Sequence, residues 1–450
     1  MDYQRALKDL KAIEQQGIHL GLENTRIILD HLPIDISRTP FIQVAGTNGK
    51  GSTAHFLASI FQAAGYTVGL FTSPHLQDVR ERISINQRWI PGDDFATSYW
   101  TIKEISLDLL KKGLIAHMPT YFEQLFLTAI HYFSFSREVP GIIILEVGLG
   151  GRLDATSTIR PVVSVITNIA RDHTVMLGTR IRDIAAEKAG IIKTGVPVVC
   201  GCKVGSIAHH VIKKTARQNH APFFNVIDAK NHLQIRNNNN TNGDSYQCTY
   251  TTESETYTFY VHLNGPHQAT NAAAAIKTLQ ILQNKNTISI SRQSICEGIA
   301  NTVIPARIEI IAATPQIILD GGHNVDSIAA LTHFLREKKK RNLTLIFGVL
   351  ADKNYRKMIM LLLPHIKNII LTEPHSKRAL PATKMLKFLK RNHNPKPIPL
   401  NNHKIFIKNN LEEAYAAAQQ FNRDILVTGS FYLVGAVRKM IIRRIRWPIY

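Results

Sequence analysis

The chain has few cysteines, and none has the spacing of a paired metal-binding or redox motif. Four occur in 450 residues, at Cys200, Cys202, Cys248 and Cys296, and no two are separated by the two residues of a C-x-x-C motif. That spacing is typical of zinc sites and of redox-active thiols. We therefore interpret the four thiols as structural residues of a protein in a reducing compartment.

Long apolar runs are also missing. No stretch approaches the ~18 residues that a bilayer-spanning helix needs. The N-terminal sequence MDYQRALKDLKAIEQQ alternates charged and apolar side chains at helical spacing, unlike a secretory signal. The last helix, expected at 432–445, is basic on one side and apolar on the other. Packing on its own sheet is favoured for it over membrane-surface binding. We expect a cytoplasmic protein with no membrane partner.

Acidic residues are outnumbered, with 33 Asp and Glu against 54 Lys and Arg, for a net charge of +21. Such a charge attracts nucleic acids, acidic lipids or polyanionic substrates. The excess is spread along the chain, with dense runs only at Arg336–Arg341 and Arg438–Arg446, and no aromatic residues interleave a basic stripe. A compositional bias toward Lys, Asn and Ile explains this charge, so we expect no nucleic-acid partner. A nucleic-acid-binding P-loop ATPase is the alternative from another class.

The length and the order of the expected elements indicate two domains. Residues 1–300 alternate strands and helices and then form a small antiparallel meander at 232–263, with an Asn-rich tip at 237–244. After 301–307, where a proline interrupts the pattern, β/α units alternate to the end of the chain. The sequence predicts an α/β fold: an N-terminal P-loop nucleotide-binding parallel sheet at 1–300 and a C-terminal Rossmann-like parallel sheet at 301–450.

The stretch FIQVAGTNGKGST at 41–53 has the order strand, glycine loop and helix. Small residues free backbone N–H groups, and a helix N-terminus directed at the loop favours an anion. In Gly49-Lys50-Gly51-Ser52, the lysine and serine supply the ammonium and hydroxyl that phosphate oxygens and a metal ion need. The residue types match the chemistry of the generic nucleotide loop, but their spacing does not. Val44 stands where a glycine is expected, and Gly51 separates Lys50 from Ser52. A plain glycine-rich turn is the alternative.

Polar side chains also follow other strands that are expected to be buried. Ser73 follows the run at 67–71, Glu146 lies near the end of GIIILEV at 141–147, and Asp172-His173 follow the run at 161–168. Because the carboxyl ends of parallel strands meet at one edge of a sheet, we expect these groups beside the phosphate loop. A hard cation shared with nucleotide phosphates accounts for them together. The alternatives are an ion pair of Glu146 with Arg152 and a hydrogen-bonded structural role for His173.

Nine stretches in sequence order carry a family resemblance. They are GTNGKGS (46–52), SPHL (73–76), EVGLGGRLDAT (146–156), DHTVMLG (172–178), EKAGIIK (187–193), GPHQATNAAAA (265–275), PARIE (305–309), DGGHN (320–324) and FGVLADK (347–353). Together they resemble the Mur-ligase-like ATP-dependent amide ligases, and among these the folylpolyglutamate synthase and dihydrofolate synthase family. The peptidoglycan-building Mur ligases are the nearest alternative, but they carry a UDP-recognition domain before the loop. The 45 residues ahead of Gly46 are too few for one.

The resemblance implies an ATP-dependent ligase of folate biosynthesis. In that family ATP converts a carboxylate into an acyl phosphate, which the amine of L-glutamate attacks through a tetrahedral intermediate. The acceptor is dihydropteroate, a reduced folate or both. We expect both, with folylpolyglutamate synthase activity alone as the alternative. The resemblance also implies two Mg²⁺ ions, with a monovalent cation as a further candidate, and we expect a monomer with small-molecule substrates.

The same resemblance implies roles for individual residues. The catalytic positions are Lys50, Lys188 and His323. The ATP-binding positions are Asn48, Gly49, Lys50, Gly51, Ser52, Asn271, Arg307 and Asp320. The metal ligands are Ser52, Ser73, Glu146 and His173. The pterin-binding positions are Phe122, Leu153, Asp154 and Ala155.

Lys188 matches a lysine that family members carbamylate, which turns a cation into a carboxylate-like group beside the metal. The alternative is an unmodified lysine that pairs with Glu187 or with solvent. Departures from the family pattern are small. Gly322 in DGGHN stands where Ala is usual, Ser157 stands where Asn commonly ends the GRLDAT stretch, and Arg171 adds a positive charge before Asp172-His173.

Overall fold

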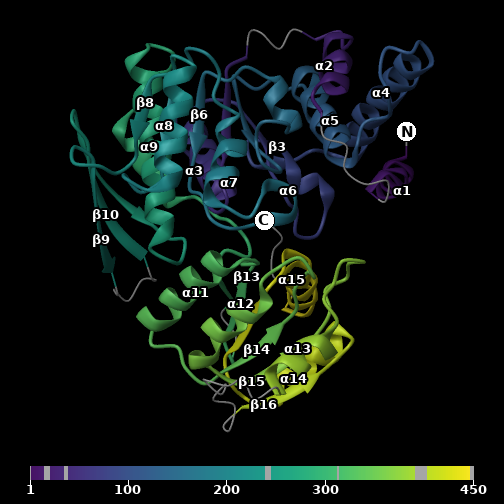
Figure 1. Cartoon of the computed structure of the whole chain (residues 1–450), viewed down its shortest axis with the longest axis vertical. Helices are drawn as coiled ribbons and strands as arrows, with labels where there is room; N and C mark the ends of the chain where they lie inside the picture. Colours follow the sequence, from purple (N-terminus) through teal and green to yellow (C-terminus); the bar gives the residue numbers. More distant parts are fainter. Residues whose placement is uncertain are drawn as a thin grey trace. The chain divides into compact units, whose positions relative to one another are not determined.

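The computed structural model describes residues 2–14, 21–34, 39–238, 245–311, 314–390 and 403–445. The chain divides into two compact units (Figure 1). Unit 1 comprises Met1–Ala170, Thr179–His262 and Ala269–Thr302, and unit 2 comprises Arg171–Gly178, Leu263–Gln268 and Val303–Tyr450. Two short segments from the N-terminal part of the sequence thus belong to unit 2. The domain assignment at 1–300 and 301–450 stays a prediction.

The main sheet of unit 1 has eight strands in the order β4-β3-β2-β5-β1-β6-β7-β8. They are β1 (Phe41–Ala45), β2 (Val68–Phe71), β3 (Ile83–Ile85), β4 (Arg88–Trp89), β5 (Ile142–Glu146), β6 (Val163–Ile166), β7 (Val198–Cys200) and β8 (Phe223–Asn225). The six strands from β2 to β8 in this order run parallel, and β3 and β4 add an antiparallel edge. The central strands β1, β5 and β6 are buried at every residue, which explains their largely apolar sequences.

The helices of unit 1 form separate groups, most of which pack on this sheet. They are α1 (Tyr3–Glu14), α2 (Glu23–Asp30), α3 (Lys50–Ala63), α4 (Gly92–Lys111), α5 (Tyr121–Phe135), α7 (Ile181–Ala189), α8 (Ile207–Gln218), α9 (His267–Asn284, in unit 1 from Ala269) and α10 (Arg292–Ala300). One hydrophobic core joins α1, α2, α4 and α5 to Phe41, Phe71 and Leu145 of the sheet. A second core joins α7 and α8 to β6 and β7. Helix α3 contacts β1, β2 and β5 and packs against α10.

A small antiparallel sheet in the order β11-β10-β9 completes unit 1 (Figure 1). Its strands are β9 (His232–Asn238), β10 (Ser245–Thr251) and β11 (Thr256–Val261). Strand β11 alternates exposed and buried residues and contacts α10. The predicted meander is confirmed, although 239–244 of its expected tip lie outside the described residues.

Unit 2 contains a six-stranded sheet in the order β12-β13-β17-β14-β15-β16. Its strands are β12 (Glu309–Ile311), β13 (Ile317–Asp320), β14 (Leu343–Phe347), β15 (Ile366–Leu371), β16 (Lys404–Ile407) and β17 (Ile425–Thr428). Its helices are α6 (Thr174–Leu177), α11 (Val325–Glu337), α12 (Tyr355–Leu362), α13 (Ala382–Lys390), α14 (Leu411–Gln419) and α15 (Phe431–Ile445). Five strands are parallel, as the β/α alternation predicts, but β12 is antiparallel to β13. The connection from β12 to β13 is too short for a parallel crossover.

The last helix packs on its own sheet. Leu433, Val434, Val437 and Ile441 of α15 are buried, and the helix contacts β17 and β13. The preference for packing over membrane-surface binding is therefore confirmed. Across the parts of the chain that the structure describes, no helix has the length and the apolar character needed to cross a membrane.

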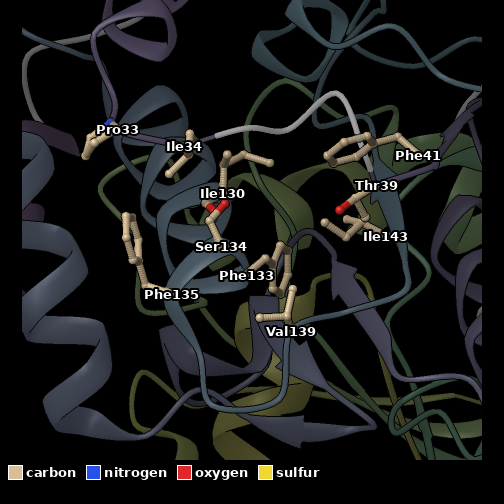
Figure 2. A pocket seen from close by; sticks show the side chains of 10 residues that line it. All are labelled: Pro33, Ile34, Thr39, Phe41, Ile130, Phe133, Ser134, Phe135, Val139 and Ile143. Carbon is tan, nitrogen blue, oxygen red and sulfur yellow. The ribbon is translucent and has the colours of Figure 1, made fainter.

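A cavity of about 170 Å³ lies in unit 1 between α5 and the amino-terminal ends of β1 and β5. It is lined by Pro33, Ile34, Thr39, Phe41, Ile130, Phe133, Ser134, Phe135, Val139 and Ile143 (Figure 2). The phosphate loop follows the carboxyl end of β1, so this cavity lies at the opposite edge of the sheet. The candidate site therefore lies at the other edge, where the strand ends carry the polar residues.

Contact between α3 and α10 generates a first prediction. A Cβ added at Gly298 of α10 would lie 2.4 Å from the Ile60 Cα of α3. Because that atom belongs to the backbone, Gly298→Ala must push the helices apart. We expect a melting temperature lower by roughly 2–10 °C, from an overpacking cost of about 1–3 kcal/mol. Gly21→Ala, with no atom within 4 Å of the added Cβ, is the matched control. Equal melting of the two variants would contradict the packing argument.

Candidate active site

The phosphate loop has the geometry that the sequence predicts. It leaves β1 at Gly46, and α3 begins at Lys50 after Gly49, which has a left-handed φ of 84°. A Cβ on Gly49 would lie 2.4 Å from the Asn271 Oδ1, and one on Gly46 would lie 1.9 Å from the Thr167 Oγ1. Both glycines are therefore needed for close packing, and the turn aims the N-terminus of α3 at the loop. Backbone N–H groups in this arrangement bind anions.

Residues that follow β6 hold the loop in place. The Thr167 Oγ1 donates to the Asn48 carbonyl at 2.7 Å, and the Asn48 amide donates to the Asn168 Oδ1 at 2.8 Å. Thr47 makes two hydrogen bonds to the same segment. Its amide donates to the Asn168 carbonyl, and its hydroxyl accepts from the Ala170 amide. Sequence reasoning missed Thr167 and Asn168 as loop supports. Their place at the carboxyl end of a strand was the available signal.

Two lysines converge on the carbonyls of this loop. The Lys50 Nζ donates to the Gly46 and Thr47 carbonyls, each at 3.2 Å. The Lys188 Nζ, from α7, donates to the same Gly46 carbonyl at 2.7 Å and is 5% exposed. The predicted catalytic lysines of unit 1 thus share one acceptor. The burial of Lys188 contradicts the alternative in which it pairs with solvent. Its neighbour Glu187 pairs with Arg152, at 2.9 Å.

Glu146 lies at the edge of the sheet beside the loop. Strands β1 and β5 are parallel neighbours with Val44 opposite Glu146, which is 3% exposed. The Ser73 amide, just beyond β2, donates to the Glu146 Oε2 at 2.9 Å. The alternative ion pair of Glu146 with Arg152 is not formed, because Arg152 pairs with Glu187 instead. Ser52, in the first turn of α3, is also buried. The Glu146 carboxylate therefore lies beside Ser73, at the strand end where a hard cation is expected.

The predicted pterin-binding residues Leu153, Asp154 and Ala155 belong to a loop that packs on itself, and Phe122 contacts this loop at Gly148. The Phe122 ring lies 5.6 Å from that of Phe71, and a Cβ on Gly148 would come within 2.5 Å of it. Asp154 accepts from the amides of Gly148 and Leu149, each at 3.0 Å. Burial raises the pKa of the Asp154 carboxyl, and these hydrogen bonds oppose the rise. Asp154 therefore shapes the backbone of the loop, while the Phe122 ring supplies an apolar surface.

A second group of polar residues lies in unit 2 around Asp172. This side chain accepts from the Lys353 Nζ at 2.6 Å and the Asn324 Nδ2 at 3.0 Å, and the His323 Nε2 lies 3.3 Å away. Burial acts to raise the pKa of Asp172, but the hydrogen bond and charge of His323, with His173 and Lys353, hold it well below its usual range. Ligand atoms of Asp172, His173 and His323 lie within 4.8 Å of one another, close enough to share a metal ion.

Asp320 and Arg307, two predicted ATP-binding residues, also lie in unit 2. Asp320 ends β13, and its two oxygens accept from the amides of Gly322 at 3.0 Å and Ile308 at 3.2 Å. Burial raises the pKa of this carboxyl. The Arg307 guanidinium lies over the Phe431 ring, 4.7 Å from its centroid. Sequence reasoning missed Phe431, since an aromatic residue at the start of a helix carries no functional signal.

The predicted residues are thus divided between the units. The described structure gathers Asn48, Gly49, Lys50, Gly51, Ser52, Ser73, Glu146, Lys188 and Asn271 around the strand ends of unit 1. It places His173, Arg307, Asp320 and His323 in unit 2. The glycine loop between a parallel strand and a helix, with an acidic strand end beside it, defines unit 1 as a nucleotide-binding α/β structure of the P-loop class.

Comparisons with known proteins identify the family within that class. The Mur ligase middle domain matches residues 101–279, and the Mur ligase glutamate ligase domain matches 306–431. The chain is 35% identical to a folylpolyglutamate synthase of Lacticaseibacillus casei over 411 residues, covering 89% of this chain and 90% of that protein. It therefore belongs to the folylpolyglutamate synthase and dihydrofolate synthase family of Mur ligases.

Two solved structures resemble the chain over nearly its whole length. One is Escherichia coli FolC in complex with DHPP and ADP, with a TM-score of 0.84 and 28% identity over 99% of this chain and 98% of that one. The other is a bifunctional folylpolyglutamate synthase/dihydrofolate synthase with Mn, AMPPNP and L-glutamate bound. Its TM-score is 0.79, with 27% identity over 98% of each chain. The likeness confirms the predicted family and the α/β fold class.

The ion pair of Asp172 with Lys353 generates a second prediction. Their side chains are 6% and 5% exposed, so Lys353→Met removes the ammonium group from a buried carboxylate and leaves it only Asn324 and the neighbouring histidines. We expect a loss of about 3–5 kcal/mol of unfolding free energy, measured by urea denaturation of the full chain. Adding Asp172→Asn should restore part of the loss, because the uncompensated charge is removed. Lys340→Met breaks a pair that is about 30% exposed and should cost less than about 1 kcal/mol. Equal losses at Lys353 and Lys340 would contradict the prediction.

Proposed function

We propose that this chain is an ATP-dependent ligase that joins L-glutamate, through an acyl phosphate, to dihydropteroate and to reduced folates. The observation that carries the proposal is the phosphate loop with Lys50, beside which the register of β1 and β5 sets Glu146. The relatives add support, since their structures hold ADP with DHPP in one case and AMPPNP with Mn and L-glutamate in another. Use of both acceptors is the expectation, and folylpolyglutamate synthase activity alone is the alternative.

Nucleotide binding would rest on the loop and its supports. Backbone N–H groups at the start of α3 bind phosphate oxygens, and the Lys50 ammonium offsets charge that develops on the transferred phosphoryl group. Thr167 and Asn168 fix the loop before any ligand arrives, so little ordering is needed on binding. Asn271 lies against Gly49 and is a further nucleotide contact in this proposal. Arg307 and Asp320, which lie in unit 2, are proposed as ATP-binding residues on the family resemblance alone.

A divalent cation fits the donors at the strand ends of unit 1. Ser52, Ser73 and Glu146 offer hydroxyl and carboxylate oxygens, which Mg²⁺ prefers. Glu146 is buried, and a carboxylate at that depth requires compensating interactions. A bound Mg²⁺ supplies charge neutralisation to phosphoryl transfer. His173 as a ligand of a second ion, and a monovalent cation, remain parts of the proposal that rest on the family resemblance.

Lys188 would act next to the phosphates. Its amine is buried and donates to the Gly46 carbonyl, at the first residue of the loop. Carbamylation would replace this cation by an anion at the same place and so favour a metal ion there. We propose this modification, which would appear as a mass increase on the peptide containing Lys188 that is lost on acidification.

The acceptor and the amino acid would use other parts of the units. The Phe122 ring and the backbone at 153–155 offer a flat apolar surface and close peptide groups, which suit a pterin ring. In unit 2, Asp172 and His323 present a carboxylate and an imidazole within 3.3 Å of each other, which suits the amine of glutamate. We assign His323 a catalytic position for this reason. We further propose a cytoplasmic monomer whose partners are small molecules only.

The function is tested by an assay of the purified chain. With ATP, Mg²⁺, L-glutamate and either dihydropteroate or tetrahydrofolate, we expect one ADP and one phosphate released for each glutamate added, and a product heavier by one glutamyl residue. Mass spectrometry of the products and a coupled phosphate assay measure both. Turnover with tetrahydrofolate alone would reduce the proposal to folylpolyglutamate synthase. Absence of turnover with both acceptors would overturn it.

The metal site is tested by Glu146→Gln. Loss of a charged ligand removes several kcal/mol of charge stabilisation, so we expect kcat/KM for ATP to fall about 100-fold or more. Chelation of Mg²⁺ should abolish turnover of the unchanged chain. Glu138→Gln is the matched control, because Glu138 is exposed and pairs with Arg88 on the surface. Turnover that survives both chelation and Glu146→Gln would exclude the site.

A further inference from the structure

Phe431, the first residue of α15, contacts two of the proposed functional residues of unit 2. The Arg307 guanidinium lies 4.7 Å from the centroid of its ring. The His323 ring lies 5.7 Å from the same ring, tilted by 54°. A cation over an aromatic face is attracted by the ring, and adjacent aromatic rings restrict each other's orientation. One apolar side chain therefore contacts a residue proposed to bind ATP and another proposed to be catalytic.

The backbone around Phe431 fixes its ring. Strand β17 ends at Thr428, and the amide of Gly429, with a left-handed φ of 111°, donates to the Gly322 carbonyl at 3.1 Å. This bond joins the turn before α15 to the loop after β13. Gly321 in that loop packs so closely that a Cβ on it would lie 2.6 Å from the Phe431 Cε1. The ring thus occupies a space shaped by a glycine and has little freedom to move.

The backbone on either side of Arg307 is strained, and this conformation directs the arginine toward the Phe431 ring. Both neighbours of Arg307 have left-handed φ values, 58° at Ala306 and 52° at Ile308. For a β-branched residue such as Ile308 this conformation is a genuine outlier, and such outliers cluster at functional sites. Hydrogen bonds hold it: the Ile308 amide donates to the Asp320 Oδ2 at 3.2 Å, and the Asn264 Nδ2 donates to the Ile308 carbonyl at 2.9 Å.

We propose that Phe431 is a positioning residue that holds the Arg307 guanidinium and the His323 imidazole in their working orientations, and so sets nucleotide affinity through Arg307. The inference rests on the proposed function, because it takes Arg307 as a nucleotide contact. The strained turn brings the arginine to the ring, and the ring fixes the end of its long side chain. An arginine held in place loses less conformational entropy when it binds a phosphate.

A double-mutant cycle with Arg307 tests the proposal. The affinity of the full chain for Mg²⁺-ADP is measured by titration calorimetry, which requires no turnover. Phe431→Leu should weaken binding about 2- to 30-fold, the range expected for loss of a cation–π contact. Phe431→Tyr keeps the ring and should bind like the unchanged chain. In an Arg307→Met background, Phe431→Leu should cause no further loss, because the residue through which it acts is absent.

Controls separate positioning from folding. Phe406→Leu is the matched variant, since Phe406 packs on Phe421 in the same unit and should leave ADP affinity unchanged. If Phe431→Leu does not fold, as judged by thermal melting, Phe431→Met replaces it in the same cycle. In turnover assays Phe431→Leu should raise the KM for ATP more than it lowers kcat.

The outcomes distinguish this inference from the function on which it rests. Unchanged ADP affinity in folded Phe431→Leu, or an equal loss with and without Arg307, would overturn the positioning role. If Arg307→Met itself binds ADP normally, the assignment of Arg307 to the nucleotide fails, and the inference fails with it. Absence of ligase turnover in the unchanged chain, with the cycle as expected, would overturn the proposed function alone.

Discussion

The parallel pairing of β1 with β5 and β6 is the constraint on which the candidate site of unit 1 depends. The register sets Val44 opposite Glu146 and Ala45 opposite Ile166, so the three strands end at one edge of the sheet. Side chains alternate between the two faces of a strand, and a slip of one residue would turn Glu146 to the other face. The loop supports Thr167 and Asn168 depend on the same alignment, because they leave β6 where the phosphate loop leaves β1.

Four buried charged side chains constrain the loops around both groups of polar residues. Glu146, Lys188, Asp172 and Lys353 are between 3% and 8% exposed. Buried charges are tolerated only when they are paired or hydrogen-bonded, and each therefore imposes a geometry on its neighbours. Lys188 draws the Gly46 carbonyl toward α7, whereas Asp172 and Lys353 neutralise each other within unit 2. Exclusion of water also strengthens every electrostatic interaction that a bound phosphate would make.

The sequence predicts the central strands, most helices and the phosphate loop, because each shows a pattern within a short stretch of the chain. The apolar run at 141–147 contains β5, and the last helix, expected at 432–445, is α15 with one more residue at its start. Helix α5 begins after Thr120, which forms a capping box with Glu123. Helices α4 and α8 and the short strands β3, β4, β8 and β12 were not predicted. Strands of two or three residues are too short to show a periodicity.

The side-chain contacts were harder to foresee because they join distant parts of the chain. Lys188 and Gly46 are 142 positions apart, and no periodicity links α7 to the phosphate loop. Spacing suggested Arg152 as a partner of Glu146, six positions away, yet the fold brings Arg152 to Glu187, 35 positions away. The role inferred for Phe431 likewise depends on two loops that meet only when β13 pairs with β17.

The contacts around Asp320 also favour glycine at position 322, where the family resemblance leads us to expect Ala. A Cβ at this position would lie 2.5 Å from the Asp320 Oδ1, the atom that accepts from the Gly322 amide. An alanine would require the Asp320 carboxylate to rotate, and that rotation would move the Oδ2 that binds the Ile308 amide. With glycine at position 322, Asp320 keeps both hydrogen bonds. Its carboxylate can therefore hold the left-handed backbone on either side of Arg307 without rotating. The local geometry therefore accounts for glycine at this position. Through the hydrogen bonds of Asp320, Gly322 connects the end of β13 to the backbone that orients Arg307.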